Sequence, residues 1–97
     1  MAIVFNRAVQ RDVNQILEYY RREAGDVLAD AFFEELLAAI DDAHEHPERH
    51  HYAVQPLRRV NLKRFPYNFI FREIGSDIRV LVVRHHKRHP SFGLRRR

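Results

Sequence analysis

The sequence has 97 residues, enough for one domain around a modest hydrophobic core, and its apolar share of 45% argues against a wholly disordered chain. It contains no Cys, which excludes disulfide frameworks, thiol nucleophiles and Cys-ligated zinc. The net charge of +4 conceals an acidic half and a basic half: residues 1–48 carry four Lys or Arg and eleven Asp or Glu, whereas residues 49–97 carry thirteen and two. The basic half favours an anionic partner, either nucleic acid or an acidic protein.

The chain shows no targeting or membrane-spanning pattern. It has no run of about 18 apolar residues, the length that a membrane span needs. The opening stretch MAIVFNRAVQ lacks the charged, then apolar, then small-residue layout of a secretory signal. We therefore expect a cytoplasmic protein that makes no contact with a membrane.

The first half of the chain has the apolar spacing of two amphipathic helices. In residues 9–24 the apolar face consists of Val9, Val13, Ile16, Leu17, Tyr20 and Ala24. In residues 27–45 it consists of Leu28, Phe32, Leu36, Ala39, Ile40 and Ala43, and Phe33 and Leu37 widen it. We expect Gly25 to end the first helix and Asp26 to cap the second. The short link predicts an antiparallel helical hairpin.

The remaining segments have the spacing of strands. Residues 2–7, 58–63, 67–73 and 78–86 are expected strands, and the last is apolar on both faces, which is typical of a central position in a sheet. Residues 46–57 are expected to form a loop. The order predicts an α+β fold, β-α-α-β-β-β, with a mostly antiparallel four-stranded sheet and the helical hairpin on one face. Residues 1–97 then form a single domain, and residues 90–97 a flexible basic tail.

Basic residues gather on the predicted strands and just after them, where they could clamp phosphates or stabilise charge that develops during phosphodiester cleavage. They are Arg58, Arg59, Lys63, Arg64, Arg72, Arg79, Arg84, His85, Lys87 and Arg88. His85 could also transfer a proton near neutral pH. The alternative is that these charges only protect sheet edges from aggregation. That alternative suits any single Arg, whereas the cluster as a whole favours a binding role.

Two further groups carry weaker signals. The seven His residues are expected to be exposed loop residues, because neither Cys nor an H-E-x-x-H pattern accompanies them, so we expect no metal and no cofactor. Among the aromatics, Phe69 and Phe71 alternate in a strand and are expected in the core. Tyr67 and Phe92 remain candidates for stacking on RNA bases.

The second half of the chain resembles the RelE/ParE superfamily, the toxins of type II toxin–antitoxin modules, including members named plasmid stabilisation proteins. Arg58, Leu62, Phe65, Pro66 and Tyr67 match an R-x-x-x-L-x-x-F-P-Y hairpin. The last strand ends in H-x-x-R-x-P, matched by His85, Arg88 and Pro90. The family's fold has the order of elements predicted above.

The resemblance implies a growth-inhibiting toxin that a cognate antitoxin holds inactive in a hetero-oligomer. ParE-like members inhibit DNA gyrase and have no nuclease site. RelE-like members cleave mRNA on the ribosome without a metal; here Arg58, Lys63 and Arg72 would clamp phosphates and His85 would act as acid or base. In either case Arg59, Arg64, Arg84, Lys87, Arg88 and Tyr67 are the candidates for contact with the target or with nucleic acid.

The residues after Pro90 favour the ParE-like alternative. Ser91, Phe92, Gly93 and Leu94 replace the Tyr-Trp of many relatives, and the catalytic Tyr that RelE-like nucleases place near the end is absent. Whether the chain is an enzyme depends on this choice. A third alternative is an RNA-binding module without toxicity.

Overall fold

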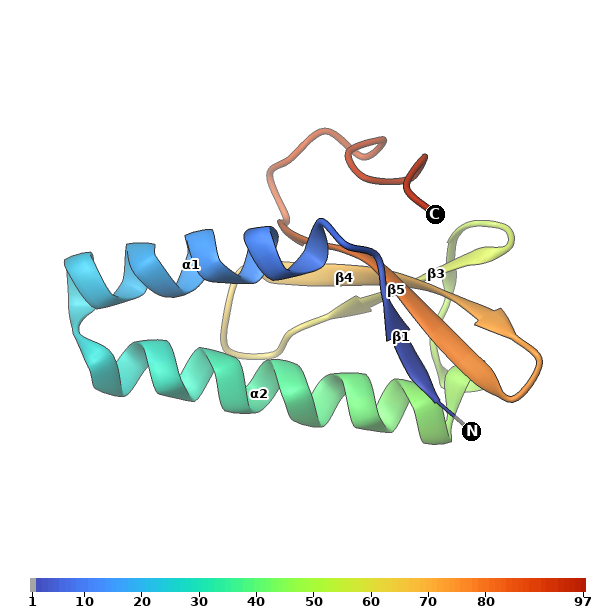
Figure 1. The fold of residues 1–97 in the computed structure, drawn as a ribbon, viewed down its shortest axis with the longest axis horizontal. Coiled ribbons are helices and arrows are strands. Elements are labelled where there is room, and N and C mark those ends of the chain that lie inside the picture. Colours follow the sequence, from blue (N-terminus) through green and yellow to red (C-terminus); the bar gives the residue numbers. More distant parts are fainter. Residues whose placement is uncertain (1) are drawn as a thin grey trace.

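A helical hairpin lies on one face of a five-stranded sheet in the computed structural model, which describes residues 2–97 (Figure 1). The elements in chain order are β1 (Ile3–Phe5), α1 (Val9–Ala24), α2 (Asp26–Glu45), a short 3-10 helix (Pro47–Arg49), β2 (Tyr52–Val54), β3 (Leu57–Asn61), β4 (Tyr67–Ile74) and β5 (Asp77–His85). The predicted α+β fold is confirmed. No helix of the described residues is long and apolar enough to span a membrane.

The sheet has the strand order β1-β5-β4-β3-β2. β1 runs parallel to β5, with Ile3 opposite Ile78, and the other three pairs are antiparallel. β5 thus has a neighbour on each side, and Val80 to Val83 are all buried. Burial on both faces explains why this strand reads as a continuous apolar run.

The fifth strand, β2, lies within residues 46–57, which were expected to be a loop. It has only three residues, all of them exposed, and it pairs with β3 through Tyr52 opposite Arg58 and Val54 opposite Leu57. An edge strand this short has no buried face and therefore no alternation of apolar and polar residues to reveal it. The expected four-stranded sheet is extended by this one strand.

The helical hairpin turns at Gly25, whose φ of 94° is a conformation that glycine adopts without a steric cost. Its amide N–H donates to the carbonyl oxygen of Tyr20, which ends α1 as expected. Asp26 is not a separate cap, because α2 begins at this residue and no side-chain hydrogen bond caps it. Gly25 serves as the boundary of both helices.

The main core lies between the helices and the sheet. Phe32 and Leu36 of α2 pack there with Phe69, Phe71 and Val80, all almost fully buried. A bulge interrupts the β4–β5 ladder: Ile70 pairs with Val82 and Phe71 with Val80, so Leu81 is the extra residue. Leu81 and Val82 therefore both pack with Ile70 in a second cluster, on the other side of the sheet.

We call this other side the outer face. Alternation along the strands assigns to it Leu57, Arg59, Asn68, Ile70, Arg72, Arg79, Leu81, Val82 and Arg84. Residues 90–97 return across it, and Phe92 and Leu94 pack against its apolar cluster (Figure 1). The basic tail expected from the sequence thus has a defined position on the sheet.

Candidate functional site

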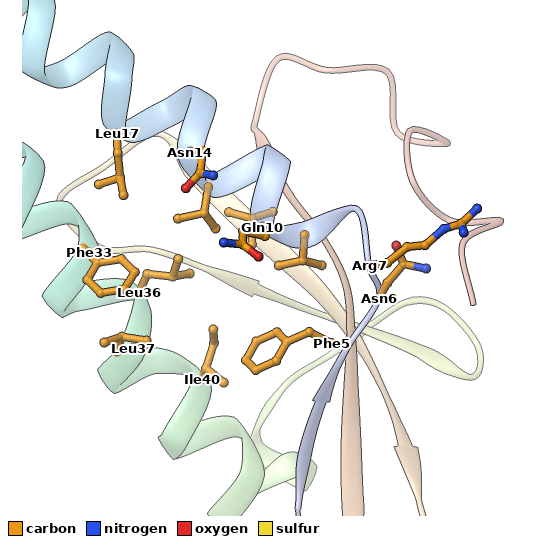
Figure 2. A pocket seen from close by; sticks show the side chains of 13 residues that line it. Phe5, Asn6, Arg7, Gln10, Asn14, Leu17, Phe33, Leu36, Leu37 and Ile40 are labelled. Carbon is orange, nitrogen blue, oxygen red and sulfur yellow. The ribbon is translucent and has the colours of Figure 1, made fainter.

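An apolar groove opens between α1, α2 and β1 (Figure 2). Its volume is about 530 Å³, and its floor includes Leu36, Ile40 and Val83. Phe5, Phe33 and Leu37 point into it (Figure 2) while remaining 47%, 39% and 44% exposed. Three large apolar side chains that stay partly exposed around one hollow make the groove a candidate surface for a partner.

The groove arises because the apolar arc of α2 is wider than the core needs. Phe32, Leu36 and Ile40 are buried against the sheet, whereas Phe33 and Leu37 follow them one position later and reach past it. The α1 rim is polar, with Gln10 and Asn14 at the groove (Figure 2). This groove was not predicted from the sequence, although the extra apolar residues of the second helix, Phe33 and Leu37, were its signal.

The basic block after β5 begins with Arg84, which is buried on the outer face. Its Nε donates to Asn68 Oδ1 at 3.0 Å, and its Nη1 donates to the carbonyl oxygens of Pro90 and Phe92 at 2.7 and 2.8 Å. Burial, followed by the nearby charge of Arg59, lowers the pKa of the Arg84 guanidinium. Arg84 thus holds the tail in place.

His85 follows at the end of β5, half-buried beside two other rings. Its ring meets that of Tyr67 edge-on at 5.1 Å and stacks on that of His86 at 4.6 Å. Its Nδ1 accepts the Lys87 amide N–H at 3.1 Å, so the proton of the neutral ring lies on Nε2. Burial, and then the charges of His86, Lys87 and Arg88, lower the His85 pKa. The group is a neutral donor at pH 7.

The other residues of a nuclease site, as the sequence suggested them, are dispersed. Arg58 contacts Glu73 Oε1 at 2.7 Å, the His50 carbonyl oxygen at 2.7 Å and the Tyr52 hydroxyl at 2.9 Å. Arg72 lies on the outer face, and Lys63 lies in the β3–β4 connection. Of the four main cavities of residues 2–97, none is lined by two members of the set Arg58, Lys63, Arg72 and His85.

The candidates for target contact are similarly divided. Arg64 pairs with Glu35 of α2 at 3.1 Å. Tyr67 is only 9% exposed and packs edge-on against Tyr20 and Phe32, so its ring belongs to the core. Arg88 lies over the Phe92 ring at 4.6 Å, beside a small pocket of about 180 Å³ that His85 also lines. Arg59 and Lys87 are exposed. Their roles in binding stay predictions.

Within residues 2–97, no group of three or more His, Asp or Glu side chains is arranged to hold a metal ion. The acidic and basic side chains instead pair across the surface. Asp42, for example, lies 3.5 Å from Arg49 Nη1 and 3.5 Å from His50 Nε2. The groove and the outer face are candidate surfaces for engaging another molecule.

Comparisons with known proteins agree with this architecture. A chain titled "Chromosomal ParDE TA system from P. aeruginosa" superposes with a TM-score of 0.76 at 19% identity, covering 88% of this chain and 95% of that one. No curated protein matches the sequence. The family described as "ParE toxin of type II toxin-antitoxin system, parDE" matches residues 3–90. This protein therefore belongs to the ParE toxin family.

Proposed function

We propose that a cognate antitoxin neutralises this type II toxin by filling the apolar groove, and that the free toxin inhibits DNA gyrase. The observation that carries the proposal is the groove itself, because Phe5, Phe33 and Leu37 surround a hollow that the chain leaves open. The solved structure that this chain resembles is titled "Chromosomal ParDE TA system from P. aeruginosa". The match to that family makes an antitoxin the expected occupant.

The shape and chemistry of the groove suit an amphipathic helix. Two helices and a strand border an elongated hollow with an apolar floor (Figure 2), which takes the apolar face of a third helix. Asn14 and Gln10 line one wall, and Arg7 points away from the hollow and outward (Figure 2). An acidic antitoxin segment with apolar residues at positions i, i+3, i+4 and i+7 would pair its remaining side chains with this polar rim.

A co-expression experiment tests the antitoxin. The toxin is induced with and without the product of the adjacent reading frame, and binding of the two purified chains is measured by calorimetry. The Phe33→Asp/Leu37→Asp variant should lose most of the binding, because two carboxylates would enter an apolar interface. Val27→Asp is the control, because Val27 lies on the same helix at 86% exposure. Equal binding by the two variants would exclude the groove.

The dispersed arrangement of Arg58, Lys63, Arg72 and His85 supports gyrase inhibition over mRNA cleavage. A metal-free nuclease needs its acid, base and phosphate clamps around one reacting group. We expect purified toxin to block supercoiling of relaxed plasmid by gyrase. Transcripts mapped after induction should remain intact. Codon-positioned mRNA cuts with normal supercoiling would contradict the proposal.

A further inference from the structure

The outer face concentrates cations that the fold does not use. Arg59 of β3 and Arg72 of β4 are exposed there, and Arg72 lies opposite Arg79 of β5 in the ladder. The guanidinium groups of Arg59, Arg72 and Arg95 make no hydrogen bond or ion pair with any of residues 2–97. The positive charge of Arg59 also affects its neighbour Arg84, because it is one cause of the lowered pKa of the Arg84 guanidinium.

The tail adds to the same surface. Arg84 binds the Pro90 and Phe92 carbonyl oxygens, and Arg79 Nη1 donates to the main-chain oxygen of Arg97 at 3.2 Å. These contacts hold residues 90–97 across the sheet, and Arg95, within this segment, is exposed. The tail is thus a part of the charged surface.

Acidic groups compensate little of this charge. The Asp12 carboxylate, at the edge of the face, forms an ion pair with Arg96 at 2.5 Å, so its charge is already balanced. Glu73 pairs with Arg58 and lies on the other side of the sheet. Asp77, at the β4–β5 turn, accepts the Ala2 amide N–H at 2.7 Å. The outer face is therefore strongly positive.

We propose that the outer face binds the phosphate backbone of double-stranded DNA without reading its sequence. Adjacent strands lie about 4.8 Å apart, so neighbouring guanidinium groups can reach successive phosphates. Among residues 2–97, no exposed large aromatic ring lies on this face, and Arg88 and Arg96 cover the Phe92 ring. Single strands are held by base stacking, so a face with cations and no free ring suits a duplex.

Fluorescence anisotropy with a labelled duplex of about 20 base pairs and arbitrary sequence tests the proposal over a series of salt concentrations. The Arg59→Gln/Arg72→Gln/Arg95→Gln variant removes three charges from the face. The control, Arg21→Gln/Arg22→Gln/Arg49→Gln, removes three charges from exposed positions on α1 and the 3-10 helix. Both variants have the same net charge. Circular dichroism and thermal melting confirm that both remain folded.

We expect the wild-type affinity to fall linearly with salt on logarithmic axes. In the outer-face variant the slope should decrease by about 2 to 3, because each Arg–phosphate contact contributes about 0.9. The control variant should bind like wild type. Equal loss in both variants would overturn the proposal, because binding would then follow net charge alone. Tighter binding of oligo(dT), or equal binding of polyglutamate, would also overturn it. The assay contains neither gyrase nor antitoxin, so its result is independent of the proposed function.

Discussion

Asp12 and Arg96, 84 positions apart in the sequence, form a two-pronged ion pair that fastens the C-terminal segment to α1. The Asp12 carboxylate is 8% exposed and also accepts the Val83 amide N–H at 3.1 Å. Arg96 donates in addition to the Leu81 carbonyl oxygen. Because the bulge at Leu81 disturbs the regular ladder, the two side chains satisfy backbone groups beside it.

The first prediction concerns this pair. Arg96→Gln should lower the free energy of unfolding by about 2 to 4 kcal/mol, because it leaves a buried carboxylate without its counter-charge. It should also speed trypsin cleavage after Arg88, since residues 90–97 would detach more often. Urea unfolding and timed proteolysis measure the two effects. Arg95→Gln, at an exposed neighbour, is the control and should change neither. An unaltered cleavage rate in Arg96→Gln would show that the other contacts, those of Arg84 and Arg79 and the packing of Phe92 and Leu94, hold the tail without Arg96.

A second prediction concerns Gly93, which has a φ of 82° and packs on Val82. A Cβ at this position would lie 2.6 Å from Val82 Cβ, which is itself in the sheet. Gly93→Ala should therefore lower the free energy of unfolding by about 2 to 4 kcal/mol, combining strain and overpacking. Gly75→Ala has the same kind of strain, at a φ of 60°, without a neighbour within 4 Å. Gly75→Ala should lower the free energy of unfolding by about 1 kcal/mol. Equal losses for the two variants in urea unfolding would show that the contact of Gly93 with Val82 does not contribute.

A third prediction follows from the lowered pKa of His85. The folded protein keeps His85 neutral to lower pH than the unfolded chain, whose His titrates near pH 6.5. The contribution of this residue to stability should therefore be present above pH 6.5 and be lost as the pH falls through the folded pKa. Histidine proton shifts in NMR measure the titration.

Charge removal provides the control for that titration. Lys87→Gln/Arg88→Gln should raise the His85 pKa toward its ordinary value, because both cations oppose its protonation. Arg21→Gln/Arg22→Gln, in the last turn of α1, should leave the His85 titration where it is, because neither Arg contributes to the lowered His85 pKa. If the His85 pKa is the same in Lys87→Gln/Arg88→Gln as in wild type, its lowering is due to burial and His86 alone.

The fourth prediction concerns alkaline pH. Burial, followed by the neighbouring Tyr67, raises the pKa of Tyr20 to about 12. Since an unfolded Tyr ionises near pH 10, the stability due to this residue should be complete below pH 10 and be lost as the pH rises toward 12. Denaturation followed between pH 9 and 12 should show a shallower loss in Tyr20→Phe than in wild type. Tyr19→Phe, at a position 47% exposed, should change this loss much less than Tyr20→Phe, because the charge of Tyr19 is the smallest cause of the raised Tyr20 pKa.

Local periodicity predicted most of the fold. The bounds of α1 agree with the sequence interpretation, because Val9, Ile16 and Leu17 leave a clear apolar face and Gly25 ends it. β5 was identified as central because its residues are buried on both faces. β2 was missed because its three residues have no buried side. The α+β order of elements could be predicted because the helices and the longer strands each have a clear apolar pattern.

Contacts between distant segments could not be predicted in the same way. Nothing in the spacing of residues 90–97 indicates that Leu94 packs on the apolar cluster of the outer face or that Arg96 reaches Asp12. Likewise, Arg58 and Arg59 look equivalent in the sequence, yet the pleat sends them to opposite sides of the sheet. The apolar side chains of Phe33 and Leu37 indicated the groove in the sequence. Whether α1 and β1 would cover these side chains could not be predicted, because it depends on where the two elements lie in the fold.

The parallel pairing of β1 with β5 has a consequence for biosynthesis. β5 is the last strand to be translated, and its neighbour on one side, β1, is the first. A nascent chain that lacks residues 77–85 cannot join β1 to the β4–β3–β2 part of the sheet. Folding must therefore wait for late, long-range closure, which is intrinsically slow. A ribosome can thus finish four of the five strands before a harmful molecule exists in the cell that makes it.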